Sequence, residues 1–317
     1  RATGEVLYEK NADERLAPAS VTKVMTLLLV MEAIDSGRLS LDDTVTMSAH
    51  AVSMGGSQIW LKENEQMTVR DLLKAVTVVS ANDGAVALAE RVAGSEEAFV
   101  AMMNQRALEL GMTDTCFVNC TGLPAAGHLT SAHDIAVMSR ELILNHPSIR
   151  EYTTIWMDTL RNGAFQLSNT NKLIRFYSGA TGLKTGFTSG AGYCLSASAM
   201  RDGMELIAVV LHCASSTDRF ESAKSLLDYG FANFAVVSPD LSDCDNQIPV
   251  RLGKDAGVSA VPEADMALLI DKAQKSGVTS EVTLEPTVTA PVSRGQRLGT
   301  LTVKSGDLVL KEVPLVA

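Results

Sequence analysis

The feature that most constrains this chain is an apolar segment, residues 24–34, with too few polar side chains to form a hydrophilic face. A helix that is apolar on almost every side is typical of a domain interior, because a surface helix keeps one polar face. Asp35-Ser36-Gly37 follows and predicts the end of this helix. The neighbouring parts of the chain must therefore supply the elements that surround it.

Ser20 and Lys23 stand directly before the apolar segment. Residues three positions apart share one face of a helix, so their side chains can meet. A serine in the first turn lies among unpaired backbone N–H groups at the positive end of the helix dipole, where an oxyanion is stabilised. The pair is therefore compatible with a nucleophile and its base. It is equally compatible with an N-cap serine beside an unrelated lysine.

Size and charge limit the classes of function. The chain has 317 residues, 46% of them hydrophobic, enough for one large domain or two ordinary ones. Its net charge of −10 argues against nucleic acid as a partner and against binding of the folded body to an anionic membrane. The longest apolar run is far shorter than the about 20 residues that span a bilayer. Because the chain opens on Arg1 without a signal peptide, we expect a mature or trimmed fragment.

The cysteines predict no metal site. They show neither Cys-x-x-Cys spacing nor a histidine pair at zinc-binding distance in the sequence. We expect them to be free structural thiols, and a Cys116–Cys120 disulfide stays open as an alternative. The five are Cys116, Cys120, Cys194, Cys213 and Cys244.

Helices and strands are both expected in the first 237 residues. Thr68 to Asp71 resembles a capping box, and Ser131 precedes a second amphipathic pattern. Residues 4–10 alternate as in a strand, which implies a partner strand before residue 1. Residues 206–211, after a hairpin turn, resemble a buried central strand. We therefore predict an α+β domain with one sheet assembled from both ends of the domain. Its further helices are expected at residues 69–76, 85–92, 96–110, 131–144 and 218–233.

Residues 238–317 predict a second, smaller domain. Short alternating segments separated by proline and glycine are typical of β-structure. The one helical signal expected there is an acidic stretch at residues 263–271. The predicted division is thus a larger domain over residues 1–237 and a small β-rich domain over residues 238–317.

Two further motifs accompany the Ser20-x-x-Lys23 pair. Ser80-Ala-Asn82 lies between two predicted helices, and Lys184-Thr185-Gly186 precedes a long strand-and-hairpin pattern. Residues 275–277 and 304–306 also fit a Lys-[Ser/Thr]-Gly pattern, but they lie in turn-rich parts of the second domain. We interpret those two matches as coincidental.

The three motifs in this order resemble those of the low-molecular-mass penicillin-binding proteins, specifically the D-alanyl-D-alanine carboxypeptidases. The likeness includes residues 18–26, 80–90, 181–188 and 218–220, and it covers residues 1 to about 237. It implies a β-lactamase/transpeptidase-like domain, in which helices and a helical subdomain flank an antiparallel sheet. The tail is similar to the small C-terminal domain that such enzymes often carry.

The resemblance also implies catalytic roles. Ser20 would attack a peptide carbonyl to form an acyl-enzyme, with Lys23 as its base. Burial and the like charge of Lys184 should lower the pKa of Lys23. Ser80 would bridge the two lysines and relay a proton to the leaving amine.

The other implied site residues bind the substrate. Asn82 would hydrogen-bond to the amide backbone of the substrate, and Gly186 would let the substrate lie along the strand edge. The N–H groups of Ser20 and Phe187 would form the oxyanion hole, while Thr185 and Arg219 would hold the terminal carboxylate. The implied set is Asn82, Lys184, Thr185, Gly186, Phe187 and Arg219.

The implied partners are peptidoglycan stem peptides, with β-lactam antibiotics as covalent inhibitors. No cofactor, metal or nucleic acid is expected. The resemblance implies an extracytoplasmic location in the cell envelope, either secreted or held at the membrane by a C-terminal segment outside this sequence.

Two other functions stay open at this point. A class A β-lactamase needs a deacylating glutamate, and Glu141-Leu-Ile-Leu-Asn145 fits its Glu-x-x-Leu-Asn pattern. We interpret that match as coincidental, because Glu141 falls on the predicted helix after Ser131. The other alternative is a non-catalytic peptidoglycan-binding module.

For His128, in a loop rich in glycine, we prefer a packing role over a catalytic one.

Overall fold

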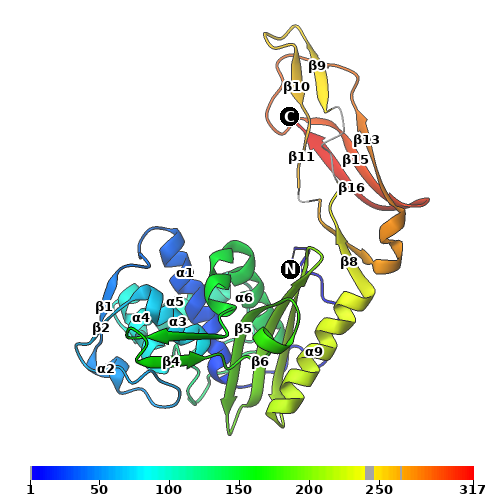
Figure 1. Cartoon of the computed structure of the whole chain (residues 1–317). Coiled ribbons are helices and arrows are strands. Elements are labelled where there is room, and N and C mark those ends of the chain that lie inside the picture. The colour runs from blue at the N-terminus through cyan, green and yellow to red at the C-terminus, as the bar shows by residue number, and fades with distance from the viewer. Residues whose placement is uncertain (1, 240–245, 265) are drawn as a thin grey trace. The chain divides into compact units, whose positions relative to one another are not determined.

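The computed structural model describes residues 2–239, 246–264 and 266–317 (Figure 1). The chain divides into two compact units. The first is Val6–Tyr229, and the second is Gly230–Ala317 together with Ala2–Glu5. Each unit is described by itself below.

The predicted buried helix lies at the centre of the first unit. It begins as a 3₁₀ turn, η1 (Ala19–Thr22), and continues as α1 (Lys23–Asp35). Every residue from Lys23 to Met31 is buried. Gly37 follows at φ 74°, a left-handed conformation that suits glycine and ends the helix where expected.

Of the further helices of this unit, α4, α5 and α6 pack against α1, and serine or threonine caps begin several of them. Thr68 Oγ1 accepts a hydrogen bond from the Asp71 N–H at 3.2 Å, which confirms the predicted capping interaction. Ser131 caps its helix in the same way. The helices are α2 (Ala49–Val52), α3 (Val69–Val78), α4 (Asn82–Ala93), α5 (Glu96–Glu109), α6 (Ala132–Asn145), η2 (Pro147–Ile149), α7 (Arg150–Thr153), α8 (Leu173–Phe176) and α9 (Ser216–Asn233).

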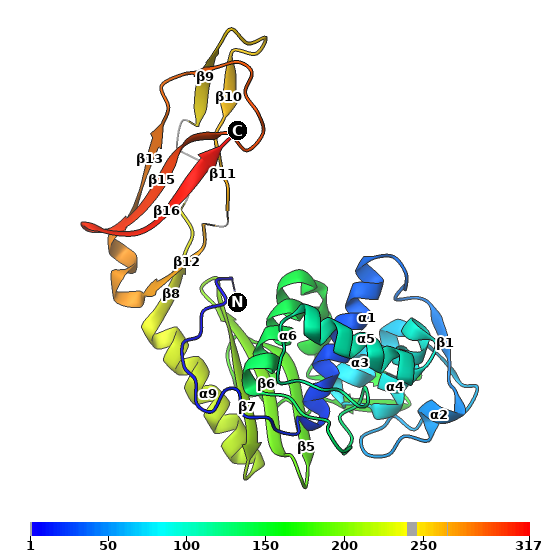
Figure 2. The same cartoon turned by 180° about the vertical axis from the view of Figure 1, so that it is seen from behind.

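The main sheet of the first unit has three antiparallel strands in the order β5-β6-β7. These are β5 (Ala180–Thr188), β6 (Gly192–Arg201) and β7 (Met204–Cys213). The sheet lies between α9 and the helices around α1 (Figure 2). Two small hairpin-like pairs complete the unit: β1 (Thr44–Thr46) with β2 (Gln66–Thr68), and β3 (Met157–Leu160) with β4 (Phe165–Ser168).

Three strand predictions were wrong. Residues 4–10 pair with no strand in the described part of the chain, because alternation alone does not supply a hydrogen-bonding neighbour. The sheet is therefore built from residues 180–213 and not from both ends of the domain. Residues 206–211 lie in β7, whereas the central strand is β6. Their apolar composition instead reflects packing of β7 against α6.

The second unit is β-rich, as predicted. A four-stranded sheet has the order β11-β16-β15-β13, and Leu298, Leu301 and Val313 are buried in the core beside it. The helix predicted at residues 263–271 is not seen in the described part of that stretch: its last residues form β12, which pairs with β8, and the 3₁₀ helix η3 follows. The elements are β8 (Phe234–Val237), β9 (Gln247–Arg251), β10 (Gly257–Ser259), β11 (Val261–Pro262), β12 (Leu268–Asp271), η3 (Lys272–Gly277), β13 (Val278–Leu284), β14 (Val288–Thr289), β15 (Arg297–Ser305) and β16 (Leu308–Val316).

Four cysteines, Cys116, Cys120, Cys194 and Cys213, are free thiols in the structure. Cys244 lies outside the described residues.

Candidate active site

The junction of η1 and α1 brings Ser20 and Lys23 together. Nζ of Lys23 lies 2.9 Å from Oγ of Ser20, as expected for residues three positions apart. Lys23 is completely buried, whereas Ser20 is partly exposed. The hydroxyl is thus reachable from solvent while the amine behind it is shielded.

Lys23 has three hydrogen-bond acceptors around its amine. They are Ser20 Oγ at 2.9 Å, Asn82 Oδ1 at 2.6 Å and the carbonyl oxygen of Thr121 at 2.7 Å. Burial lowers the pKa of Lys23 to about 7, although the charges of Cys120 and Asp83 act in the opposite direction. A substantial fraction of Lys23 is therefore a neutral amine near pH 7, as a general base requires.

This pKa gives an expected pH dependence. If neutral Lys23 takes the proton of Ser20, acylation should be slow below pH 7 and reach a plateau above it. Below the pKa, each unit of pH should change the rate about tenfold, because only the deprotonated fraction reacts. Acylation rates with a chromogenic cephalosporin, measured from pH 5 to 9, check this. A rate independent of pH from 5 to 7 would contradict the role of Lys23.

Ser80 and Asn82 lie at the break between α3 and α4. Ser80 has a left-handed backbone, φ 64°, and its buried Oγ has no hydrogen-bond partner among the described residues. The expected direct bridge from Ser80 to Lys23 and Lys184 is therefore not formed. Asn82, and not Ser80, contacts Lys23: its Oδ1 accepts a hydrogen bond from Lys23 Nζ. Its Nδ2 donates to the Gly55 carbonyl at 2.6 Å. Both ends of the Asn82 amide are thus used within the protein.

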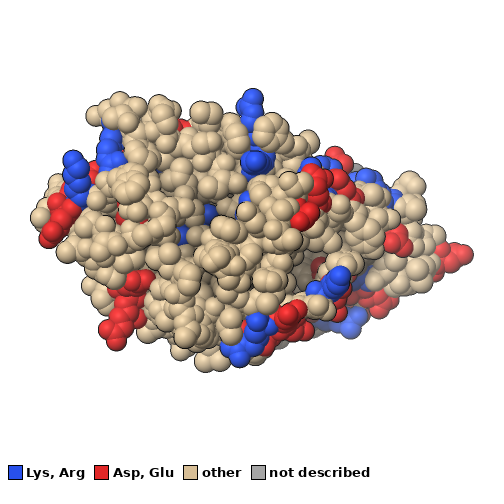
Figure 3. Space-filling model, turned by 90° about the horizontal axis from the view of Figure 1, so that it is seen from below, with Lys and Arg blue, Asp and Glu red and all other residues tan. Residues whose placement is uncertain are grey.

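The third motif lies within β5. Lys184 is 1% exposed, and burial first, then the positive charges of Lys23 and Arg219, lowers its pKa well below the usual range. Thr185 Oγ1 lies 2.7 Å from Thr170 Oγ1, which holds its hydroxyl in place. Figure 3 shows a face of the molecule where lysine or arginine atoms are visible in a recess among uncharged residues.

Gly186 brings β5 against the backbone that carries Ser20. A Cβ on Gly186 would lie 2.6 Å from the Pro18 carbonyl oxygen and 3.0 Å from the Ser20 nitrogen. The missing side chain thus makes room for the protein's own backbone. The approach of a substrate along this strand edge stays a prediction. Phe187 is 54% exposed, and its ring lies 4.3 Å from that of Tyr193.

Arg219 extends from α9 to the same end of β5. Its Nη1 donates to the carbonyl oxygens of Gly186 and Cys194 at 3.2 and 3.4 Å, and its guanidinium lies over the rings of Tyr193 and Phe220. It is 7% exposed, and its Nε has no partner in the described part of the chain. Burial lowers the pKa of this guanidinium. The group is therefore a buried cation with unused hydrogen-bonding capacity.

Comparison with known proteins decides the family. A family profile described as D-alanyl-D-alanine carboxypeptidase matches residues 1–215. The chain belongs to the D-alanyl-D-alanine carboxypeptidase family. A second profile, described as the C-terminal domain of penicillin-binding protein 5, matches residues 241–317. The family resemblance and the fold class predicted from the motifs are confirmed.

Relatives of this carboxypeptidase-family chain match from about three quarters of it to its whole length. It is 43% identical to D-alanyl-D-alanine carboxypeptidase DacF of Bacillus subtilis, over 100% of this chain and 82% of the relative. It is also similar to the crystal structure of penicillin binding protein 5 from Haemophilus influenzae, with a TM-score of 0.82 and 31% identity over 98% of this chain and 92% of that one. Penicillin-binding protein D2 of Listeria monocytogenes, in an ampicillin-bound form, is 36% identical with a TM-score of 0.66, over 73% of this chain and 93% of that one.

Glu141 and His128, considered above for catalytic roles, make structural contacts in this carboxypeptidase-family protein. Glu141 accepts a hydrogen bond from Arg106 at 2.6 Å on α6, in an ion pair that supports the view of its β-lactamase-like pattern as coincidental. His128 lies 2.7 Å from Thr22 Oγ1 and accepts from the Val118 N–H at 3.0 Å, and burial lowers its pKa to about 4. This is the loop-packing role predicted for His128.

Sequence reasoning missed two contributors to the site. The Thr121 carbonyl accepts a hydrogen bond from Lys23, and Thr170 holds Thr185. Every residue has a backbone carbonyl, so residue type does not show which one contacts Lys23. The one available signal for the first was the Thr121-Gly122 pair in a loop rich in glycine and proline.

Proposed function

We propose that this chain removes the terminal D-alanine from peptidoglycan stem peptides through an acyl-enzyme on Ser20. The observation that carries the proposal is the 2.9 Å contact between Ser20 Oγ and the buried amine of Lys23, whose pKa of about 7 suits a base. Family membership supports the reaction class.

In the proposed acylation, Ser20 Oγ bonds to the carbonyl carbon of the penultimate residue while its proton passes to Lys23. The N–H groups of Ser20 and Phe187 receive the oxyanion. When the C–N bond breaks, the proton that Lys23 took from Ser20 passes through Ser80 to the leaving D-alanine nitrogen. The buried Ser80 hydroxyl has no partner among the described residues, so it is available to turn toward both groups. Water then attacks the ester and releases the shortened peptide.

The proposed substrate contacts come from the other motif residues. Asn82, by exchanging its bond to the Gly55 carbonyl for one to the substrate, and the edge of β5 at Gly186 would align the peptide. Lys184, Thr185 and Arg219 would receive its terminal carboxylate. The electrostatic basis is local: the buried guanidinium of Arg219 and the buried amine of Lys184, whose charged form a bound carboxylate would favour, lie near β5 in a chain of net charge −10. They can attract an anion that the protein as a whole repels.

Loss of the guanidinium should distinguish acids from amides. Arg219→Ala should lower kcat/KM about 10- to 100-fold for diacetyl-Lys-D-Ala-D-Ala, since a hydrogen bond to a charged group is worth about 1.5–3 kcal/mol. The same peptide with a terminal amide should lose far less. Arg219→Lys, which keeps the charge without the planar fork, should fall between the two. Equal losses for acid and amide would contradict the role of Arg219.

We also propose that residues 1–237 form the catalytic domain and residues 238–317 a separate one. All proposed site residues lie between Ser20 and Arg219, within the first compact unit. A chain that ends after Val237 should therefore still release D-alanine from small peptides. A folded truncation without activity would overturn this division.

The proposed location is extracytoplasmic, where stem peptides are exposed. Among the described residues, none of the helices has the length and apolar character needed to cross a bilayer. We propose that a C-terminal segment outside this sequence provides attachment to the membrane. Fractionation of cells that express the full-length gene product tests this: recovery in the cytoplasm would contradict it.

A direct assay tests the proposed function. Release of D-alanine from diacetyl-Lys-D-Ala-D-Ala should accompany acylation of Ser20 by benzylpenicillin. A protein that does neither would be the non-catalytic module left open above.

A further inference from the structure

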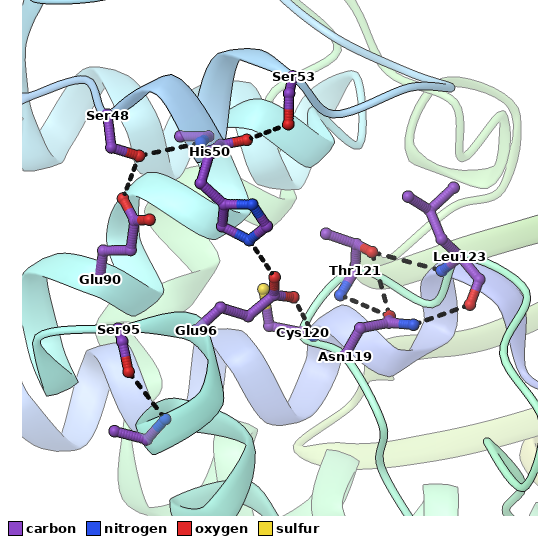
Figure 4. Close-up of polar contacts among 12 residues, drawn as sticks. Ser48, His50, Ser53, Glu90, Ser95, Glu96, Asn119, Cys120, Thr121 and Leu123 are labelled. Carbon is purple, nitrogen blue, oxygen red and sulfur yellow. Dashed lines mark hydrogen bonds and ion pairs between the residues drawn. The ribbon is translucent and has the colours of Figure 1, made fainter.

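Glu96 connects the N-terminus of α5 to the loop that contains Cys120 and Thr121 (Figure 4). It is the first residue of α5, after the N-cap Ser95. Its Oε1 accepts a hydrogen bond from the Cys120 N–H at 3.1 Å, and its Oε2 lies 2.7 Å from His50 Nε2. Burial opposes ionisation of this carboxyl, but the hydrogen bonds from Cys120 and His50 outweigh it and lower the pKa. Glu96 is thus a carboxylate that holds a backbone amide.

The loop that Glu96 holds is closely tied by hydrogen bonds. Asn119 Oδ1 accepts from the N–H groups of Thr121 and Gly122 at 3.2 and 2.7 Å, and its Nδ2 donates to the Leu123 carbonyl at 2.9 Å. The Cys120 carbonyl accepts from Thr26 Oγ1 at 2.7 Å, which ties the loop to α1. The Thr121 carbonyl is then the group that accepts from Lys23 Nζ, at 2.7 Å.

The orientation of the Lys23 amine depends on that carbonyl. A neutral amine has two N–H bonds and one lone pair. If the N–H bonds go to Asn82 Oδ1 and the Thr121 carbonyl, the lone pair faces the third neighbour, Ser20 Oγ at 2.9 Å. A base that can turn freely is a poorer base, since it must first find the direction of the proton that it accepts.

We infer that Glu96 is a positioning residue for Lys23, acting through the Cys120 amide and the Thr121 carbonyl without contact with the substrate. The inference rests on the proposed function, in which Lys23 is the base for Ser20. It assigns the α5 terminus, whose residues carry none of the three motifs, a part in the acylation step.

The test compares Glu96→Ala with Glu97→Ala. Glu97 is the next residue on α5, also acidic and more exposed. We would measure acylation by a chromogenic cephalosporin from pH 5 to 9, with thermal unfolding recorded for each variant. Glu96→Ala should acylate at least about tenfold more slowly at its plateau, whereas Glu97→Ala should match the unaltered protein.

The pH profile separates positioning from general damage to the fold. The ammonium form of Lys23 uses the Thr121 carbonyl as an acceptor, so displacement of that carbonyl should lower the pKa of Lys23 further. The acid limb of the Glu96→Ala profile should therefore move to lower pH, by about half to one unit. The other ionisable groups that act electrostatically with Lys23 are Asp83, Cys120 and Lys184. Burial, then Glu96, raises the pKa of the Cys120 thiol, and the burial of Cys120 does not depend on the Glu96 side chain alone, so Cys120 should stay a neutral thiol in the variants.

Two conservative variants complete the design. Glu96→Gln keeps an oxygen that can accept from the Cys120 N–H, so it should recover most of the plateau rate. Glu96→Asp is too short to reach both partners and should behave like Glu96→Ala, which keeps the test decisive if the alanine variant does not fold. Wild-type rate and profile in Glu96→Asp, or equal losses in Glu97→Ala, would overturn the inference. Failure of the unaltered protein to acylate at Ser20 would instead count against the proposed function.

Discussion

Replacing Ser20 with alanine should abolish acylation by benzylpenicillin and reduce D-alanine release by at least about 10³-fold, because no other group in the site takes the place of a missing nucleophile. The fold should be nearly unaffected. Ser20 is partly exposed, so its truncation leaves little buried space. When its hydrogen bond with Lys23 is lost, the amine keeps its two other acceptors, Asn82 and Thr121. Intact mass after drug exposure, with a D-alanine assay, measures both effects.

A matched control for this variant is Ser148→Ala. Ser148 is exposed on η2, so loss of its hydroxyl should change neither acylation nor peptide turnover. A penicilloyl adduct on the Ser20→Ala protein would show that another residue is the nucleophile.

Gly122→Ala should also have a large effect, through the backbone. Gly122 has φ +83°, and a Cβ there would lie 1.8 Å from the Ala19 carbonyl oxygen and 2.9 Å from the Ser20 nitrogen. Neither atom can move without moving the nucleophile or the proposed oxyanion hole. Because a misplacement of about 1 Å can cost about 10²-fold in rate, we expect acylation to fall by at least that factor. The left-handed backbone should add a stability loss of about 1–2 kcal/mol.

Gly127 supplies the control for Gly122. It lies in the same loop with φ +81°, but a Cβ at Gly127 would meet nothing within 4 Å in the described structure. Gly127→Ala should therefore show the stability loss in urea unfolding and near-normal acylation. Equal losses of activity in the two variants would mean that the collision with Ala19 and Ser20 is unimportant.

The sequence could predict those parts of the site that depend on the identity of a side chain. Periodicity placed Ser20 beside Lys23, and the apolar segment after them predicted a buried base. The support of that base was not predictable in the same way. The Thr121 carbonyl and Gly122 reach the site from a loop about a hundred residues along the chain, and Glu96 contacts that loop from the N-terminus of α5.

Strand order was the weakest part of the fold prediction, for a related reason. The apolar run at residues 206–211 predicts burial but not which neighbours hydrogen-bond to it, and β6 is the strand with partners on both sides. Residues 4–10 alternate correctly yet have no partner strand in the described structure. Likewise, Gly186 could be identified from its motif, but the close approach of Pro18 and Ser20 that requires it depends on the tertiary fold.

The most direct test of the central claim, that Ser20 is a nucleophile activated by Lys23, is peptide mapping after exposure to benzylpenicillin. The drug should add one penicilloyl group to the peptide that contains Ser20. After removal of free drug, the adduct should last for minutes to hours. Glu141, the one match to the β-lactamase deacylation pattern, is engaged by Arg106, and general-base assistance is typically worth about 10²–10⁴-fold. An adduct on a different residue, or rapid penicillin hydrolysis that is lost in Glu141→Gln, would contradict the account.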